Sequence, residues 1–143
     1  MPKKCNALVV VQRCIMFIEI KIPGQPVPCP RPRVSDRGTY YPKKYKDWKK
    51  QAVKYLAFTC DVKGIEACSI SITFIFQRLK TQRQIGRIAK TTRPDIDNLC
   101  KAVFDALQES GILADDGKIW SAHVDKYYAA IDEQPRIEIT ISR

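Results

Sequence analysis

The chain has 143 residues, of which 45% are hydrophobic and 28% charged, and its formal net charge is +10. This length predicts a single domain with a core of its own. No apolar run approaches the roughly 18 residues that a membrane-spanning helix needs, so no membrane span is expected.

The cysteines exclude a structural zinc site. The six of them stand at positions 5, 14, 29, 60, 68 and 100, with no pair at CxxC spacing, and His123 is the single histidine. Zinc ribbons and fingers need ligand pairs two to four residues apart. The apolar stretch 7–11 is interrupted by Gln12 and Arg13, so no signal peptide is predicted. We expect reduced thiols, most of them in the core, in a cytoplasmic protein.

The first clear element is a strand over residues 15–22, where apolar and polar side chains alternate. Met16 opens it so well that we expect residues 1–15 to be a disordered extension of a domain at 16–143. Four prolines, at positions 26, 28, 30 and 32, exclude the next segment from a helix or a central strand. It is expected to be an extended loop that presents Arg31 and Arg33.

A short strand is expected at 38–41, followed by a helix at 43–60 that starts after Pro42. One face of this helix is apolar, with Tyr45, Trp48, Ala52, Tyr55 and Leu56 at helical spacing. The other face carries Lys43, Lys46, Lys50 and Lys54. An ordinary solvated surface explains most of these lysines when they are taken singly.

The second half predicts a strand at 67–76, a helix at 96–110 and two strands at 118–128 and 136–142. The basic segment 77–93 is expected to be a mobile loop that a ligand orders. The order β-(β)-α-β-α-β-β predicts an α+β domain, with a small mixed sheet packed against two main helices.

Charge is distributed unevenly along the chain. Residues 1–90 hold 19 Lys and Arg against 5 Asp and Glu, whereas residues 91–143 hold 6 against 10. A basic body attracts phosphates, and a compact group of carboxylates can hold a divalent cation. This combination indicates a metal-dependent nuclease.

Each acidic segment has a functional and an ordinary interpretation. If the chain is extended at Asp95 and Asp97, both carboxylates point to one side; the alternative is that one of them caps the helix. Asp115-Asp116-Gly117 is either part of the site or a turn. Asp116 returns to the helix start only if the next strand lies beside the strand that leads into Asp95. Lys101 is either catalytic or part of a surface ion-pair row with Asp97 and Asp105.

The motifs together resemble the RusA family of Holliday junction resolvases. Residues 93–107 (RPDIDNLCKAVFDAL) and 115–119 (DDGKI) carry most of the resemblance. The stretches 22–28 (IPGQPVP), 31–33 (RPR) and 41–48 (YPKKYKDW) resemble the front half of that family. Lys126 fits as well, and the resemblance extends over about residues 16–143.

The resemblance implies a RusA-like fold and a Mg²⁺-dependent endonuclease that cuts four-way DNA junctions by paired symmetric nicks in recombination and repair. Asp95, Asp97 and Asp116 would bind Mg²⁺, or Mn²⁺ in its place. Lys101 would assist catalysis, with Asp105 and Asp115 in support. The basic residues expected to contact DNA are Arg31, Arg33, Lys43, Lys44, Arg83, Arg87, Lys90, Arg93 and Lys126.

The resemblance also implies that the chain forms a homodimer, and we expect the protein to come from a bacterium or a phage. A four-way junction has approximate two-fold symmetry, which a C2 dimer with two active sites would match. Two other functions stay open from sequence. One is a basic module that binds branched DNA without cutting it, and the other is a nuclease for flaps or other branches.

Overall fold

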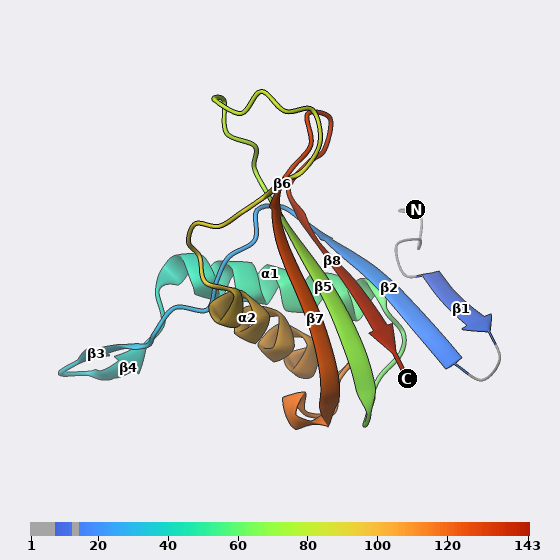
Figure 1. Cartoon of the computed structure of the whole chain (residues 1–143). Coiled ribbons are helices and arrows are strands. Elements are labelled where there is room, and N and C mark those ends of the chain that lie inside the picture. Colours follow the sequence, from blue (N-terminus) through green and yellow to red (C-terminus); the bar gives the residue numbers. More distant parts are fainter. Residues whose placement is uncertain (1–7, 13–14) are drawn as a thin grey trace.

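The computed structural model describes residues 8–12 and 15–143 (Figure 1). The elements follow in the order β1 (Leu8–Gln12), β2 (Ile15–Pro23), β3 (Arg33–Ser35), β4 (Gly38–Tyr40), α1 (Lys43–Thr59), β5 (Cys68–Phe76), β6 (Ile88–Ala89), α2 (Ile96–Glu109), the 3-10 turn η1 (Asp116–Lys118), β7 (Ile119–Tyr128) and β8 (Arg136–Ser142). Within these residues no helix is long and apolar enough to cross a membrane.

One mixed sheet forms the main layer, in the strand order β1-β2-β8-β5-β7-β6. Strands β5 and β7 are parallel, and the other neighbouring strands are antiparallel. Helices α1 and α2 lie side by side against one face of this sheet (Figure 1). The predicted α+β domain, with a small mixed sheet and two main helices, is therefore confirmed.

Rows of isoleucines that cross the central strands form the core. Ile139 on β8 pairs with Ile20 on β2 and with Ile72 on β5, and all three are buried beside Leu56 of α1 and Leu107 of α2. Truncating a buried isoleucine to alanine typically costs about 2–5 kcal/mol. Most of the alternate positions on these strands carry Glu, Lys, Arg, Ser or Thr, as expected for a sheet with one face toward water.

The predicted helices and the strands at 67–76, 118–128 and 136–142 agree with the structure to within one residue at each end. The N-terminal extension contains β1, which pairs with β2 from Leu8 opposite Glu19 to Gln12 opposite Ile15. Residues 1–7 and 13–14 of the extension lie outside the described residues. The boundary at residue 16 stays a prediction.

The structure adds a strand to the proline-rich region. The short strand expected at 38–41 is β4, and it pairs with Arg33–Ser35, which begins at the last residue of the segment that we expected to be an extended loop. The run of closely spaced prolines ends at position 32, so the backbone amides from Arg33 to Tyr40 are able to join a ladder. The two strands form a separate hairpin that projects from the body of the molecule (Figure 1).

Segment 77–93 is held by hydrogen bonds within the chain, in contrast to the mobile loop that we expected. The Arg78 guanidinium donates to the carbonyls of Gln82, Gln84, Gly86 and Ala129. Near the end of the segment, β6 pairs with the last two residues of β7. An arginine has five N–H donors in a rigid fork, and here they satisfy carbonyl groups that would otherwise bind solvent.

Glu133 ties this segment to β8. Its carboxylate accepts hydrogen bonds from Arg87 Nε at 2.8 Å, from Arg136 at 3.1 Å and from the backbone N–H of Ala130 at 3.0 Å. The bonds from Arg87 are the largest cause that lowers the pKa of Glu133, from 4.5 to about 2. One carboxylate therefore anchors two loops and a strand.

We predict that Glu133→Gln lowers the free energy of unfolding by about 1–2 kcal/mol at neutral pH, because charged hydrogen bonds are lost. The depressed pKa means that this stabilisation is complete above pH 4.5 and disappears as the pH falls toward about 2. Urea denaturation of both proteins across this range measures the effect. The exposed neighbour Asp132→Asn is the control, and a loss that does not vary with pH would contradict the mechanism.

Candidate functional site

Two of the predicted carboxylates lie at the N-terminal end of α2. Asp95 occupies the cap position with φ −72° and ψ 146°, and its side chain makes no capping hydrogen bond. Asp97 lies in the first helical turn, and both residues are exposed. The helix dipole favours negative charge at this end. Because Ile96 is already helical, the two carboxylates are neighbours within one turn, and the extended geometry that we expected applies to Asp95 alone.

Lys126 on β7 holds the segment that leads into Asp95. Its ammonium donates to the carbonyls of Thr92 and Pro94, both at 2.8 Å. Next to it, the Lys90 ammonium donates to Thr92 Oγ1 at 2.7 Å and to the Tyr128 hydroxyl at 3.2 Å. Hydrogen bonds with Thr92 and Lys90 lower the pKa of Tyr128. The segment that precedes Asp95 is therefore held in place by the side chains of two lysines.

The proline-rich segment packs against the same end of α2. The Cys29 N–H donates to the Asn98 carbonyl at 2.9 Å, and Cys29, Tyr45 and Ala102 form a small buried cluster. This contact places Arg31, two residues later, near the helix start. Cys29, Cys60 and Cys68 are free and buried, as predicted for core thiols, and Cys100 is partly buried.

Lys101 and Asp105 follow Asp97 along α2. The Lys101 ammonium lies 3.7 Å from Asp105 Oδ2, which also accepts from the Tyr45 hydroxyl at 3.5 Å. Burial is the largest cause that raises the pKa of Tyr45, and nearby Cys29 and Asp105 raise it further. The ion-pair row predicted from the spacing is thus present between Lys101 and Asp105. Asp105 also connects α2 to α1.

Asp115 and Asp116 lie at the opposite end of α2. Asp115 caps η1 by accepting a hydrogen bond from the Gly117 N–H at 2.8 Å, and this bond is the main cause that lowers the pKa of Asp115. The turn interpretation therefore describes Asp115 correctly. The Asp116 N–H donates to the side chain of Gln108 at 3.4 Å. Gln108 stands 11 positions after Asp97, which is about 16 Å along the helix axis.

Strand order explains this separation. Strand β7 does lie beside β6, which leads into Asp95, but the pairing is antiparallel and joins Ile88 to Tyr128 at the far end of β7. Asp116 precedes the start of β7. One chain therefore does not bring Asp116 to Asp95 and Asp97. In the described part of the chain, no three Asp, Glu, His or Cys side chains gather as metal ligands.

The predicted DNA-contact residues divide into two groups. Arg87, Lys90 and Lys126 are engaged in the contacts above and hold loops of the fold, and their contact with DNA stays a prediction. The others are exposed: Arg31, Arg33, Lys43, Lys44, Arg83 and Arg93. Arg37, at the tip of the β3–β4 hairpin, is exposed as well and was not among the residues predicted from the sequence. The signal for it was Asp36-Arg37-Gly38, a two-residue turn followed by a glycine with φ +111°.

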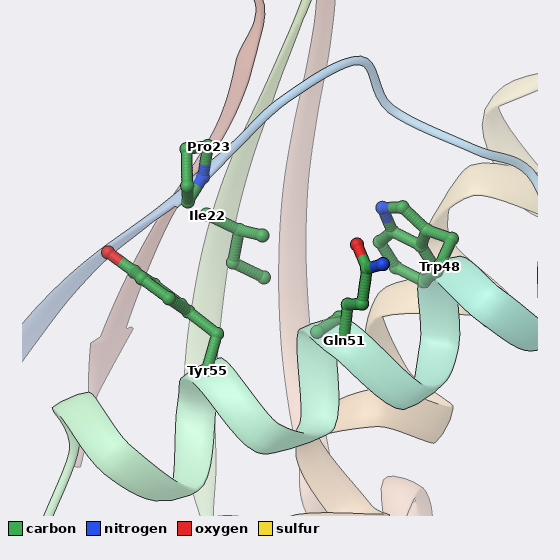
Figure 2. Close-up of a pocket in the computed structure, with 6 residues that line it drawn as sticks. Ile22, Pro23, Trp48, Gln51 and Tyr55 are labelled. Atoms are coloured by element: carbon green, nitrogen blue, oxygen red, sulfur yellow. The ribbon is translucent and has the colours of Figure 1, made fainter.

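A depression of about 170 Å³ lies between α1 and β2, away from the aspartates. In Figure 2, Trp48, Gln51 and Tyr55 project from α1 toward Ile22 and Pro23 of β2. No charged side chain is among the residues that line this depression, so it offers no carboxylate for a metal ion and no cation for a phosphate. We place the candidate site at the start of α2.

We predict that Lys126→Met lowers the free energy of unfolding by about 1–3 kcal/mol, because two charged hydrogen bonds to carbonyls are lost. Amide hydrogen exchange over residues 90–95 should accelerate more than exchange in β8. Lys50→Met, which changes an exposed lysine of α1, is the matched control. Equal effects of the two substitutions would contradict the role of Lys126.

One family model matches most of the chain. The family model described as "Endodeoxyribonuclease RusA" matches residues 23–142. Over 65 residues the chain is 37% identical to the "Uncharacterized protein YqaN" of Bacillus subtilis (strain 168). This aligned stretch is 46% of this chain and 43% of that protein. The chain thus matches less than half the length of this curated relative. A solved structure described as "Crystal structure of HypE-HypF complex" aligns with 94% of this chain and 34% of its own, at 12% identity and a TM-score of 0.39.

Proposed function

Because the chain belongs to the RusA family of endodeoxyribonucleases, we propose that it is a Mg²⁺-dependent endonuclease that resolves four-way DNA junctions by paired symmetric cleavage. Nucleases of this family are generally dependent on a divalent metal, and they hydrolyse phosphodiester bonds. The observation that carries the proposal is the pair of exposed carboxylates at the start of α2, on a strongly basic chain.

The donor set at the start of α2 fits Mg²⁺. This ion prefers oxygen ligands and usually binds through one or two carboxylates, with water and substrate phosphate in its other positions. Asp95 and Asp97 supply two such carboxylates, and neither is committed to a cap or an ion pair in the described chain. When bound, the ion would polarise the scissile phosphate and lower the pKa of the attacking water. Mn²⁺ would serve in its place.

Lys101 would stabilise the negative charge that develops on the phosphate. It stands one turn after Asp97, on the same helical face, and 57% of its side chain is exposed. Its ion pair with Asp105 holds the ammonium near that face without burying it. Asp105 would therefore act as a positioning residue, with Tyr45 behind it.

The location of Asp116 supports a homodimer. On its outer side β7 pairs with β6 at Tyr127 and Tyr128, and among the described residues no strand covers the edge from Ile119 to Asp125. Trp120 on this strand is 76% exposed. An open strand edge beside a large apolar side chain is a ready surface for another strand. We propose that β7 of a second copy pairs here across a two-fold axis.

Such a pair would complete the site. In an antiparallel pair of β7 strands, the start of one strand lies opposite the end of the other. Asp116 precedes the start of β7, whereas Lys126, near the end, anchors the segment that leads into Asp95. Asp116 of each copy would therefore approach Asp95 and Asp97 of the other. The dimer would then supply two three-aspartate sites, one for each strand to be cut.

We predict that the purified protein nicks a labelled four-way junction at paired symmetric positions with Mg²⁺ and does not cut it in EDTA. Linear duplex and a flap substrate should be cut far more slowly. Asp97→Asn should reduce cleavage by at least about 100-fold and leave junction affinity within a few-fold, because it removes a metal ligand and no DNA contact. Gel analysis of the nicks and fluorescence anisotropy measure the two quantities.

Asp61→Asn, on the exposed loop after α1, is the matched control and should cut like the wild type. Tight junction binding without cleavage in Mg²⁺ or Mn²⁺ would favour the non-cleaving branched-DNA-binding module. Faster cutting of flaps than of junctions would favour the flap nuclease. Either result would contradict the proposed function. For a nuclease of chromosomal or phage DNA we expect a cytoplasmic location, where thiols stay reduced.

A mixing experiment tests the shared site. Asp97→Asn and Asp116→Asn should each be inactive alone, but a mixture should regain nicking at one strand per junction. The mixed dimer holds one site in which both aspartates are intact, because they come from different copies. No recovery after subunit exchange, verified with tagged chains, would place Asp116 in the site of its own chain.

A further inference from the structure

The β3–β4 hairpin is exposed along both of its strands and lies outside the candidate site. All six residues of its strands are exposed, and Figure 1 shows the hairpin standing away from the sheet and the helices. The ladder between its strands is short and pairs Arg33 with Tyr40, Val34 with Thr39, and Ser35 with Gly38. An isolated two-stranded hairpin is only marginally stable in water, so its shape depends on its own turn.

Bonds within the turn fix that shape. The Arg37 N–H donates to the Ser35 hydroxyl at 3.3 Å, and this hydroxyl donates to the Gly38 carbonyl at 3.2 Å. Gly38 has φ +111°, a conformation that L side chains rarely adopt. The turn therefore projects Arg37 from the tip without a contact to the rest of the fold that would restrain it.

The side chains of the hairpin suit a polyanion with an accessible groove. Arg33 and Arg37 on the hairpin are joined by Arg31, Lys43 and Lys44 at its base, and Asp36 is the single acidic residue from 31 to 44. On the opposite face of β3, Val34 is 82% exposed. The major groove of B-DNA admits a two-stranded β-ribbon, where arginines reach phosphates or guanine edges and small apolar groups contact thymine methyls.

We propose that the β3–β4 hairpin is a DNA-docking finger that enters the major groove of one duplex arm. This inference rests on the proposed function, because it assumes a DNA substrate. Arg33 and Arg37 contact phosphates along the groove, and Val34 faces the base edges. The hairpin contributes affinity and orientation, and the chemistry stays at the start of α2.

The test compares two pairs of charge-removing substitutions. Arg33→Gln/Arg37→Gln changes the hairpin, and Lys50→Gln/Lys54→Gln removes the same charge from the exposed face of α1. Junction affinity is measured by anisotropy in EDTA at several salt concentrations. The hairpin variant should bind about 10-fold more weakly, and its salt slope should fall by about 2, because two phosphate contacts are lost. The α1 variant should bind nearly as the wild type does.

Measurements of cleavage, of binding to modified arms and of dimerisation separate the possible outcomes. Cleavage by the hairpin variant should be slowed at low protein concentration, and raising the protein concentration should restore most of it, because the loss is one of affinity. Wild-type binding should weaken on arms with glucosylated 5-hydroxymethylcytosine, which fills the major groove. Equal losses in the two variants, or a hairpin variant that loses dimerisation in sedimentation at unchanged affinity, would overturn the docking finger alone. A wild-type protein that binds no junction would overturn the proposed function as well.

Discussion

Helix α2 connects two parallel neighbouring strands, and this connection constrains where every acidic residue of the motif lies. A connection between adjacent parallel strands must return the chain along the sheet, so α2 runs antiparallel to β5 and β7. Its start, with Asp95 and Asp97, lies at one end of the sheet, and the turn with Asp115 and Asp116 lies at the other. The helix is buried through Leu99, Val103 and Leu107, so its direction cannot change without loss of the core. A motif that is compact in sequence is therefore divided in space.

The same division is the reason for proposing that a second copy of the chain contributes to the site. An open edge on β7 and the exposed Trp120 would be liabilities in a monomer, because unpaired strand edges invite association. In the proposed dimer, a two-fold axis across that edge would turn this liability into a shared site. Under this hypothesis, cleavage at two symmetric positions and assembly of the metal ligands have one cause.

Much of the positive charge in the motif region serves the fold. Arg78 satisfies carbonyls of its own loop, Arg87 is paired with Glu133, and Lys126 binds the backbone before Asp95. Cationic side chains suit this role because they offer several donors at the ends of long, flexible stems. A net charge of +10 therefore overstates the surface that is available to phosphates. Among the cations expected to contact DNA, those that are exposed and not engaged within the fold lie on the hairpin, at its base, and at Arg83 and Arg93.

The sequence alone determined the elements that depend on local periodicity. Alternating isoleucines predicted β2, β5 and β8, and the apolar stripes predicted α1 and α2, because burial on one face imposes a period of two or of 3.6. The turn at Asp115 and the helix start at Asp95 followed from local chemistry as well. Only the tertiary structure decided that β6 pairs with the far end of β7, that Lys126 reaches the carbonyl of Pro94, and that Asp116 stays away from Asp97. These relations depend on strand order and direction, which arise from contacts between residues far apart in the chain and leave no periodic signal in it.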